Sequence, residues 1–128
     1  MIKAYLASIS TQFEGEEVEA RYRIFDDGQL ILKKSLMLDY IKPALVGHAT
    51  LDTLLKELEK YNDKEIKIFI NDGALFETVN GTSGSKNREL LKMAEDTRKE
   101  IDKFDDLEII NVNGNHEQVE EWDKILKS

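Results

Sequence analysis

Cysteine is absent from this chain of 128 residues, and proline occurs once. Without cysteine, a disulfide scaffold and a cysteine-ligated zinc or redox site are excluded. Long apolar runs are also missing, since none approaches the ~20 residues that a membrane span needs. The first residues place Lys3 inside a short apolar stretch and lack the layout of a secretory signal. We therefore expect one cytoplasmic domain covering residues 1–128, with no membrane-bound part and enough length to bury a core.

Basic residues are in the minority, with 18 Lys and Arg against 26 Asp and Glu, which gives a formal net charge of −8. The imbalance lies in residues 95–123, which contain eleven acids and three bases. Binding to a phosphate backbone depends largely on Lys and Arg displacing counterions. The charge thus predicts weak binding to nucleic acid at best, and an acidic, solvated face.

Three strands are predicted in the first part of the chain, at residues 2–10, 17–25 and 29–37. In the second of them, apolar and charged residues alternate, which is typical of a strand with one face in solvent. Asp27 and Gly28 supply a hairpin turn, because Asp and Gly tolerate the positive φ that such turns require. The three strands should form an antiparallel meander.

Helices and strands alternate in the rest of the chain. Thr50 can cap a helix whose leucines recur at helical spacing from Leu51 to Tyr61, and His48 then falls in the preceding loop. Residues 66–70 read as a strand buried on both faces. Further elements are expected at 73–79 (helix), 86–104 (helix) and 107–112 (strand).

Apolar stripes should bury the last two long helices. The stripe of the helix at 86–104 consists of Leu90, Leu91, Ala94, Ile101 and Phe104. A final helix begins after Asn115, which can form a capping box with Gln118. It should bury Val119, Trp122, Ile125 and Leu126. The resulting order, β-β-β-α-β-α-β-α, predicts an α/β fold with a mixed five-stranded sheet and helices on its faces.

This order, in a chain of this length, resembles the ribonuclease H-like family. The resemblance implies a sheet of strand order 3-2-1-4-5, with the first strand central. It also implies four carboxylates that hold two divalent metal ions ~4 Å apart, Mg²⁺ or Mn²⁺, for cleavage of an RNA–DNA hybrid. These would come from the first strand, the first helix, the end of the fourth strand and the last helix.

Two of the four carboxylate positions are matched. Asp72 follows the fourth strand, and Asp123 follows Trp122 in the last helix. His116, after Gly114 and Asn115, resembles the histidine that opens a loop over the family's site. By the resemblance, Asp72 and Asp123 would be catalytic metal ligands and His116 a proton shuttle. Each also has an ordinary use: Asp72 as an N-cap, Asp123 as a solvated acid and His116 as a helix-start residue.

The other two carboxylate positions of the family are not matched. Ala7 stands where the family has the strand-1 Asp, and Thr50 stands where it has the Glu of the first helix. No acid occurs anywhere from residue 2 to residue 12, so no shift of the alignment restores the ligand that bridges both metals. Alanine offers no oxygen, which Mg²⁺ strongly prefers. The sequence therefore predicts a degenerate catalytic centre, with no cofactor expected unless nuclease activity remains.

Three functions stay open at this point, because fold alone does not decide function. The first is a non-catalytic ribonuclease H-like module that binds a protein partner or acts as a scaffold. The second is a divergent metal-dependent nuclease, in which Asp52 joins Asp72 and Asp123 and contacts to the hybrid come from Lys86, Arg88 and Lys92. The third is a small-molecule binder that uses the carboxyl edge of the sheet.

Overall fold

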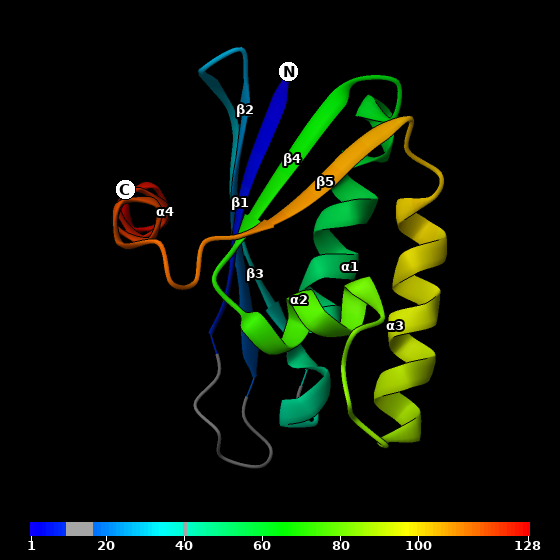
Figure 1. The fold of residues 1–128 in the computed structure, drawn as a ribbon. Helices are drawn as coiled ribbons and strands as arrows, with labels where there is room; N and C mark the ends of the chain where they lie inside the picture. Colours follow the sequence, from blue (N-terminus) through cyan, green and yellow to red (C-terminus); the bar gives the residue numbers. More distant parts are fainter. Residues whose placement is uncertain (10–16, 40) are drawn as a thin grey trace.

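All five strands of the computed structural model form one mixed sheet, in the order β3-β2-β1-β4-β5 (Figure 1). The structure describes residues 1–9, 17–39 and 41–128. The central strand β1 is antiparallel to β2 and parallel to β4, and β5 is parallel to β4. The predicted order is thus confirmed; only the expected end of the first strand, at residue 10, lies outside the described residues. The strands are β1 (Ile2–Ile9), β2 (Val18–Asp26), β3 (Gln29–Leu38), β4 (Glu65–Ile70) and β5 (Asp106–Asn111).

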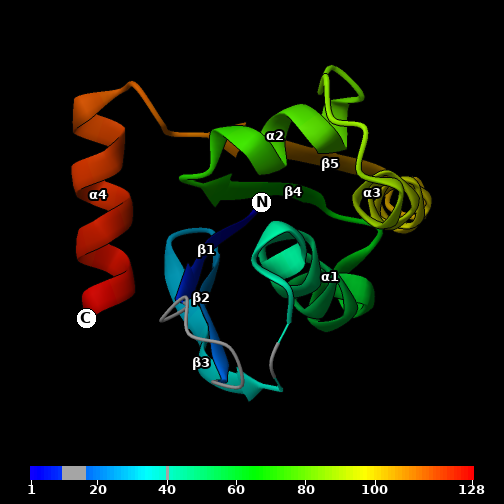
Figure 2. The same cartoon turned by 90° about the horizontal axis from the view of Figure 1, so that it is seen from below.

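The helices lie on both sides of this sheet. Figure 2 shows α4 (His116–Lys127) on one side, beside β1 and β2, and α1 (Val46–Leu58) and α3 (Arg88–Ile101) on the other. The short α2 (Gly73–Asn80) follows β4 and adds Leu75 and Val79 to the core on the α1 side. Two 3₁₀ turns, Pro43–Leu45 and Glu59–Tyr61, flank α1. Within the described residues, no helix has the length and apolar character to span a membrane.

The core lies between the sheet and α1. Strand alternation turns Ile66, Ile68 and Ile70 of β4 toward α1, where they are buried against its leucines. The expectation that this strand is buried on both faces is wrong, because Lys67 and Phe69 on its other face are only half-buried. These side chains are only half-buried because α4 packs on β1 and β2, so no helix of the described residues lies over this face of β4.

Helix α1 begins earlier than the sequence predicts, at Val46. The 3₁₀ turn at Pro43–Leu45 leads directly into the helix, with no side-chain cap. Thr50 is therefore not a cap but a buried residue inside the helix, and its hydroxyl donates to the carbonyl of Gly47 over 3.0 Å. His48, expected in a loop, lies in the same helix and is 1% exposed.

Helix α3 is shorter than predicted and buries fewer residues. It begins after Asn87, whose side chain accepts a hydrogen bond from the Leu90 N–H over 3.2 Å, and it ends at Ile101. Phe104 is buried as expected, but from the turn after the helix. Leu91 is 42% exposed, so its place on the predicted buried stripe is wrong. The contact with α1 is narrow, and only Ala94 and Thr97 of α3 are fully buried.

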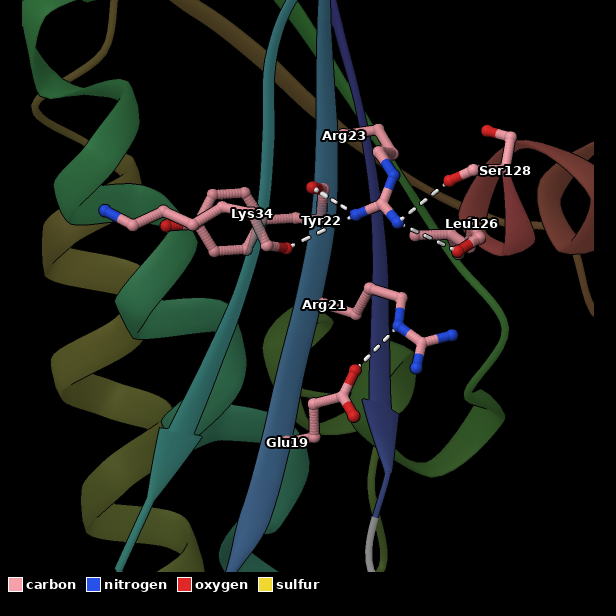
Figure 3. A network of polar contacts seen from close by, with 7 residues as sticks. All are labelled: Glu19, Arg21, Tyr22, Arg23, Lys34, Leu126 and Ser128. Carbon is pink, nitrogen blue, oxygen red and sulfur yellow. Dashed lines mark hydrogen bonds and ion pairs between the residues drawn. The ribbon is translucent and has the colours of Figure 1, made fainter.

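Polar contacts from the sheet hold α4 in place (Figure 3). The buried Arg23 of β2 donates to the carbonyls of Leu126 and Ser128, over 3.2 and 3.3 Å, at the end of the helix. The Trp122 indole N–H donates to the carbonyl of Leu6 in β1 over 3.0 Å. The predicted Asn115 cap is present, since its side chain accepts from the Gln118 N–H. Of the four apolar residues expected to be buried here, Leu126 is buried, whereas Val119, Trp122 and Ile125 are only half-buried.

Candidate functional site

The carboxyl ends of β1 and β4 meet at one edge of the sheet, where open α/β sheets bind ligands. A small hollow of about 70 Å³ opens there. Ala7 and Ser8 line it from β1, Asp72 from the end of β4, and Trp122 from α4. The structure thus brings Ala7 and Asp72 to one place, as the sequence predicts.

Asp72 caps α2. Its carboxylate Oδ1 accepts a hydrogen bond from the Leu75 N–H over 3.0 Å, and its own N–H donates to Asn111 Oδ1 over 3.3 Å. A Cβ atom on Gly47 would lie 3.0 Å from Asp72 Oδ2, so glycine at that position lets α1 and the start of α2 approach closely. Capping therefore occupies one oxygen of this carboxylate.

Two hydroxyls join the carboxyl end of β1 to α1. Ser8 Oγ and Thr50 Oγ1 are hydrogen-bonded to each other. Since the Thr50 proton is donated to the Gly47 carbonyl, Ser8 is the donor in this pair. The sequence predicts that two carboxylates of the ribonuclease H-like family are missing here. In their place the structure has Ala7 and the neutral hydroxyl pair of Ser8 and Thr50.

Asp123 lines a different surface depression from the hollow that Asp72 lines. Helix α4 presents Trp122, the neighbour of Asp123, to the hollow at the end of β1. The Asp123 carboxylate is half-exposed, makes an ion pair with Lys127 over 2.7 Å and lines a separate surface depression with Glu120 and Lys124. The two hollows that Asp72 lines and the depression that Asp123 lines have no described residue in common.

His116 is on the surface at the start of α4. Its side chain is 86% exposed, and Nε2 lies 2.9 Å from Glu120 Oε1, one helical turn away. Asp72 also lines a larger hollow of about 290 Å³ beside Gly47 and Thr78. Neither that hollow nor the one at the end of β1 includes His116 among its described residues. His116 is therefore an exposed residue on the surface of α4.

His48 forms a buried polar network that the sequence prediction missed. Its Nε2 is 2.6 Å from Thr78 Oγ1 and its Nδ1 is 3.2 Å from Thr97 Oγ1, while Thr97 donates to Asp52 over 2.8 Å. Burial lowers the pKa of His48; nearby Asp72 opposes this shift and Arg98 adds to it. Burial likewise raises the pKa of Asp52. The spacing of His48 from Leu51 and Leu55, three and seven residues on, could have placed it on the buried face of α1.

Similar solved structures decide what fold this is. No model of a protein family matches the sequence, and the comparison with curated proteins gives no match. The crystal structure of RNase H1 from the halophilic archaeon Halobacterium salinarum NRC-1 superposes with a TM-score of 0.78, at 13% identity, over 92% of this chain and 89% of that one. The chain has a ribonuclease H-like fold.

Two structures of a ribonuclease H1 from compost, LC11-RNase H1, agree. One superposes with a TM-score of 0.77, at 12% identity, over 98% of this chain and 92% of that one. The other, in complex with an RNA/DNA hybrid, gives 0.73 at 14% identity over 91% and 88% of the two chains. At these identities the likeness concerns the ribonuclease H-like fold.

The side chains at the sheet edge do not fit a two-metal centre of the ribonuclease H-like kind. Each divalent ion needs several oxygen ligands, and carboxylates supply most of them in such sites. Among the described residues, Asp72 is the one acid that lines the hollow at the end of β1. Across residues 1–9, 17–39 and 41–128, no three His, Asp or Glu side chains are grouped to hold a metal ion. Asp52, the other acid considered, is bonded to Thr97 on the α3 side of α1.

Proposed function

We propose that this chain is a ribonuclease H-like binding module, acting through a protein partner, that does not cleave RNA–DNA hybrids. The observation that carries the proposal is the Ser8–Thr50 hydroxyl pair, which stands with Ala7 where a metal-binding carboxylate pair would be needed. Hydroxyls are weak ligands for hard divalent ions unless carboxylates share the site. A neutral hydroxyl pair of this kind suits a structural join between β1 and α1.

Charge supports a protein partner over a nucleic acid. One similar structure holds an RNA/DNA hybrid, but this chain has a net charge of −8. Of the three basic residues at the start of α3, Lys92 is already paired with Asp96 over 3.1 Å, which leaves Lys86 and Arg88. Two cations displace few counterions, so hybrid binding should be weak and should fade at physiological salt.

Purified wild-type protein should not cleave a labelled RNA–DNA hybrid in Mg²⁺ or Mn²⁺. The assay runs beside a ribonuclease H1 as positive control, with Asp72→Asn as the matched variant. We expect the cleavage rates of wild type and Asp72→Asn both to equal the rate without protein. Asp72 alone cannot hold the two metal ions that would stabilise the attacking and leaving oxygens of the phosphodiester. Circular dichroism confirms that both are folded.

Cleavage by the wild type that Asp72→Asn abolishes would contradict the proposal and favour the divergent metal-dependent nuclease. The reciprocal variant is Ala7→Asp, which adds a carboxylate beside Asp72 in the hollow. Cleavage that appears in Ala7→Asp and not in wild type would support the proposal directly.

A further inference from the structure

A further hollow lies on the sheet face that α1 and α3 do not cover. It has a volume of about 270 Å³ and lies beside α4, over β1, β4 and β5. In Figure 1 this part of β4 and β5 has no helix in front of it. Its floor includes Lys3, Tyr5, Lys67 and Phe69, and α4 contributes Gln118 and Glu121 as one wall.

Two lysines stand side by side at this hollow. Lys3 of β1 and Lys67 of β4 are direct partners in the parallel register. Like charges opposite each other across strands are destabilising, so the fold bears a cost here that an acid at either position would remove. In the described part of the chain, neither ammonium has a carboxylate within ion-pair distance, although Glu108 is the register partner of Lys67 on its other side. The pair is therefore available to an anion.

An aromatic pair lies next to the lysines on the same face. Tyr5 and Phe69, two residues further along each strand, are also register partners, and their rings stack with centroids 4.8 Å apart and planes 11° from parallel. Phe25 packs edge-on against Tyr5. Tyr5 is 6% exposed and thus fixed, whereas Phe69 is half-buried and, with Ile110, leaves apolar surface in the hollow.

We propose that this hollow binds a nucleotide. The phosphate lies between the ammonium groups of Lys3 and Lys67, and the base lies on the apolar floor of Phe69 and Ile110. Gln118 and Glu121 present side-chain oxygens that accept hydrogen bonds from base N–H groups. With two cations and one carboxylate, the lining favours an anionic ligand, and its volume fits one nucleotide rather than a duplex.

The site goes beyond the proposed function and is separate from it. It lies on the α4 side of the sheet, and none of its described lining residues also lines the hollow at Ala7 and Asp72. A negative cleavage assay therefore has no bearing on it, and a failure of nucleotide binding leaves the Ser8–Thr50 argument intact.

The test is an NMR titration of the full chain with adenosine and uridine 5′-monophosphate, with adenosine and inorganic phosphate as part-ligands. We expect saturable shifts at Lys67, Phe69 and Ile110 with the nucleotides, and at least tenfold weaker binding of adenosine or phosphate alone. Lys3→Gln and Lys67→Gln should each weaken nucleotide binding about tenfold, which corresponds to ~1.4 kcal/mol.

Lys33→Gln is the matched control, because Lys33 is an exposed lysine on the edge strand β3 and should leave affinity unchanged. All three substitutions are at exposed or half-buried positions, so the variants stay folded. Shifts that do not saturate with either nucleotide would overturn the proposal, as would equal binding of phosphate alone or an equal loss in Lys33→Gln.

Discussion

Replacing Arg23 by Gln is expected to destabilise the protein by about 2 kcal/mol and to release α4 from the sheet. The Arg23 guanidinium donates to the last carbonyls of α4, at Leu126 and Ser128, and to the carbonyls of Tyr22 and Lys34 in the sheet (Figure 3). The carbonyls at a helix C-terminus lack partners within the helix and carry the negative end of its dipole. The Arg23 side chain, which is 5% exposed, donates hydrogen bonds to these carbonyls and places a positive charge at the negative end of the dipole.

The control is Arg21→Gln, two residues earlier on the same strand. Arg21 is half-buried and pairs with Glu19 over 2.6 Å, and among the described residues it makes no hydrogen bond or ion pair with α4. A partly exposed pair of this kind contributes less than about 1 kcal/mol. Urea denaturation measures both variants, and amide hydrogen exchange follows α4. Equal losses in the two variants, or undiminished protection of α4 amides in Arg23→Gln, would show that Arg23 does not anchor the helix.

Stability is expected to fall as the pH drops from 7.5 to 5.5, because of His48. Burial, the first cause, holds the pKa of His48 below 6.5 in the folded protein, with Arg98 adding to the shift and Asp72 opposing it. The unfolded chain therefore binds a proton first, near pH 6.5, and folding loses up to about 1.4 kcal/mol per pH unit until the folded pKa is reached. Asp52 has a raised pKa, so its contribution grows as the pH falls through that pKa toward 3.8, which opposes the trend of His48.

The two histidines of the chain make a matched pair for this measurement. His48→Gln keeps a polar side chain between Thr78 and Thr97 but cannot titrate, so the fall in stability from pH 7.5 to 5.5 should be absent. His116→Gln removes the exposed histidine and should keep the wild-type slope. Thermal denaturation at several pH values measures all three proteins. If stability changes with pH in His48→Gln as it does in wild type, His48 is not the cause of the pH dependence.

The strand order was predictable because the relevant signals are local. Alternation in β2 and the Asp27–Gly28 turn, where both residues have positive φ, define the meander without knowledge of distant contacts. The start of α1 was missed because it has no side-chain cap, which is the signal a sequence offers. Leu91 and the outer face of β4 were assigned to the core wrongly, since their exposure depends on how much of each surface a neighbouring helix covers.

One feature of the candidate site can be read from the sequence alone. The absence of any acid in residues 2–12 is visible in the sequence and needs no tertiary structure. The Ser8–Thr50 contact joins residues 42 positions apart, and nothing in either segment predicts the other. The face of α4 that docks on the sheet is likewise not visible in the sequence, because the hydrogen bonds of Trp122 to Leu6 and of Arg23 to Leu126 join distant parts of the chain.

Titration of the protein with Mn²⁺, followed residue by residue in the NMR spectrum, tests the central claim most directly. The claim is that the carboxyl end of β1 does not hold a metal centre. Because Mn²⁺ broadens the signals of nuclei close to its binding site, we expect diffuse, non-saturating broadening along the acidic residues of 95–123. Ser8, Thr50 and Asp72 should show no saturable effect, in wild type and in Asp72→Asn alike. Saturable broadening centred on those three residues, lost in Asp72→Asn, would contradict the account.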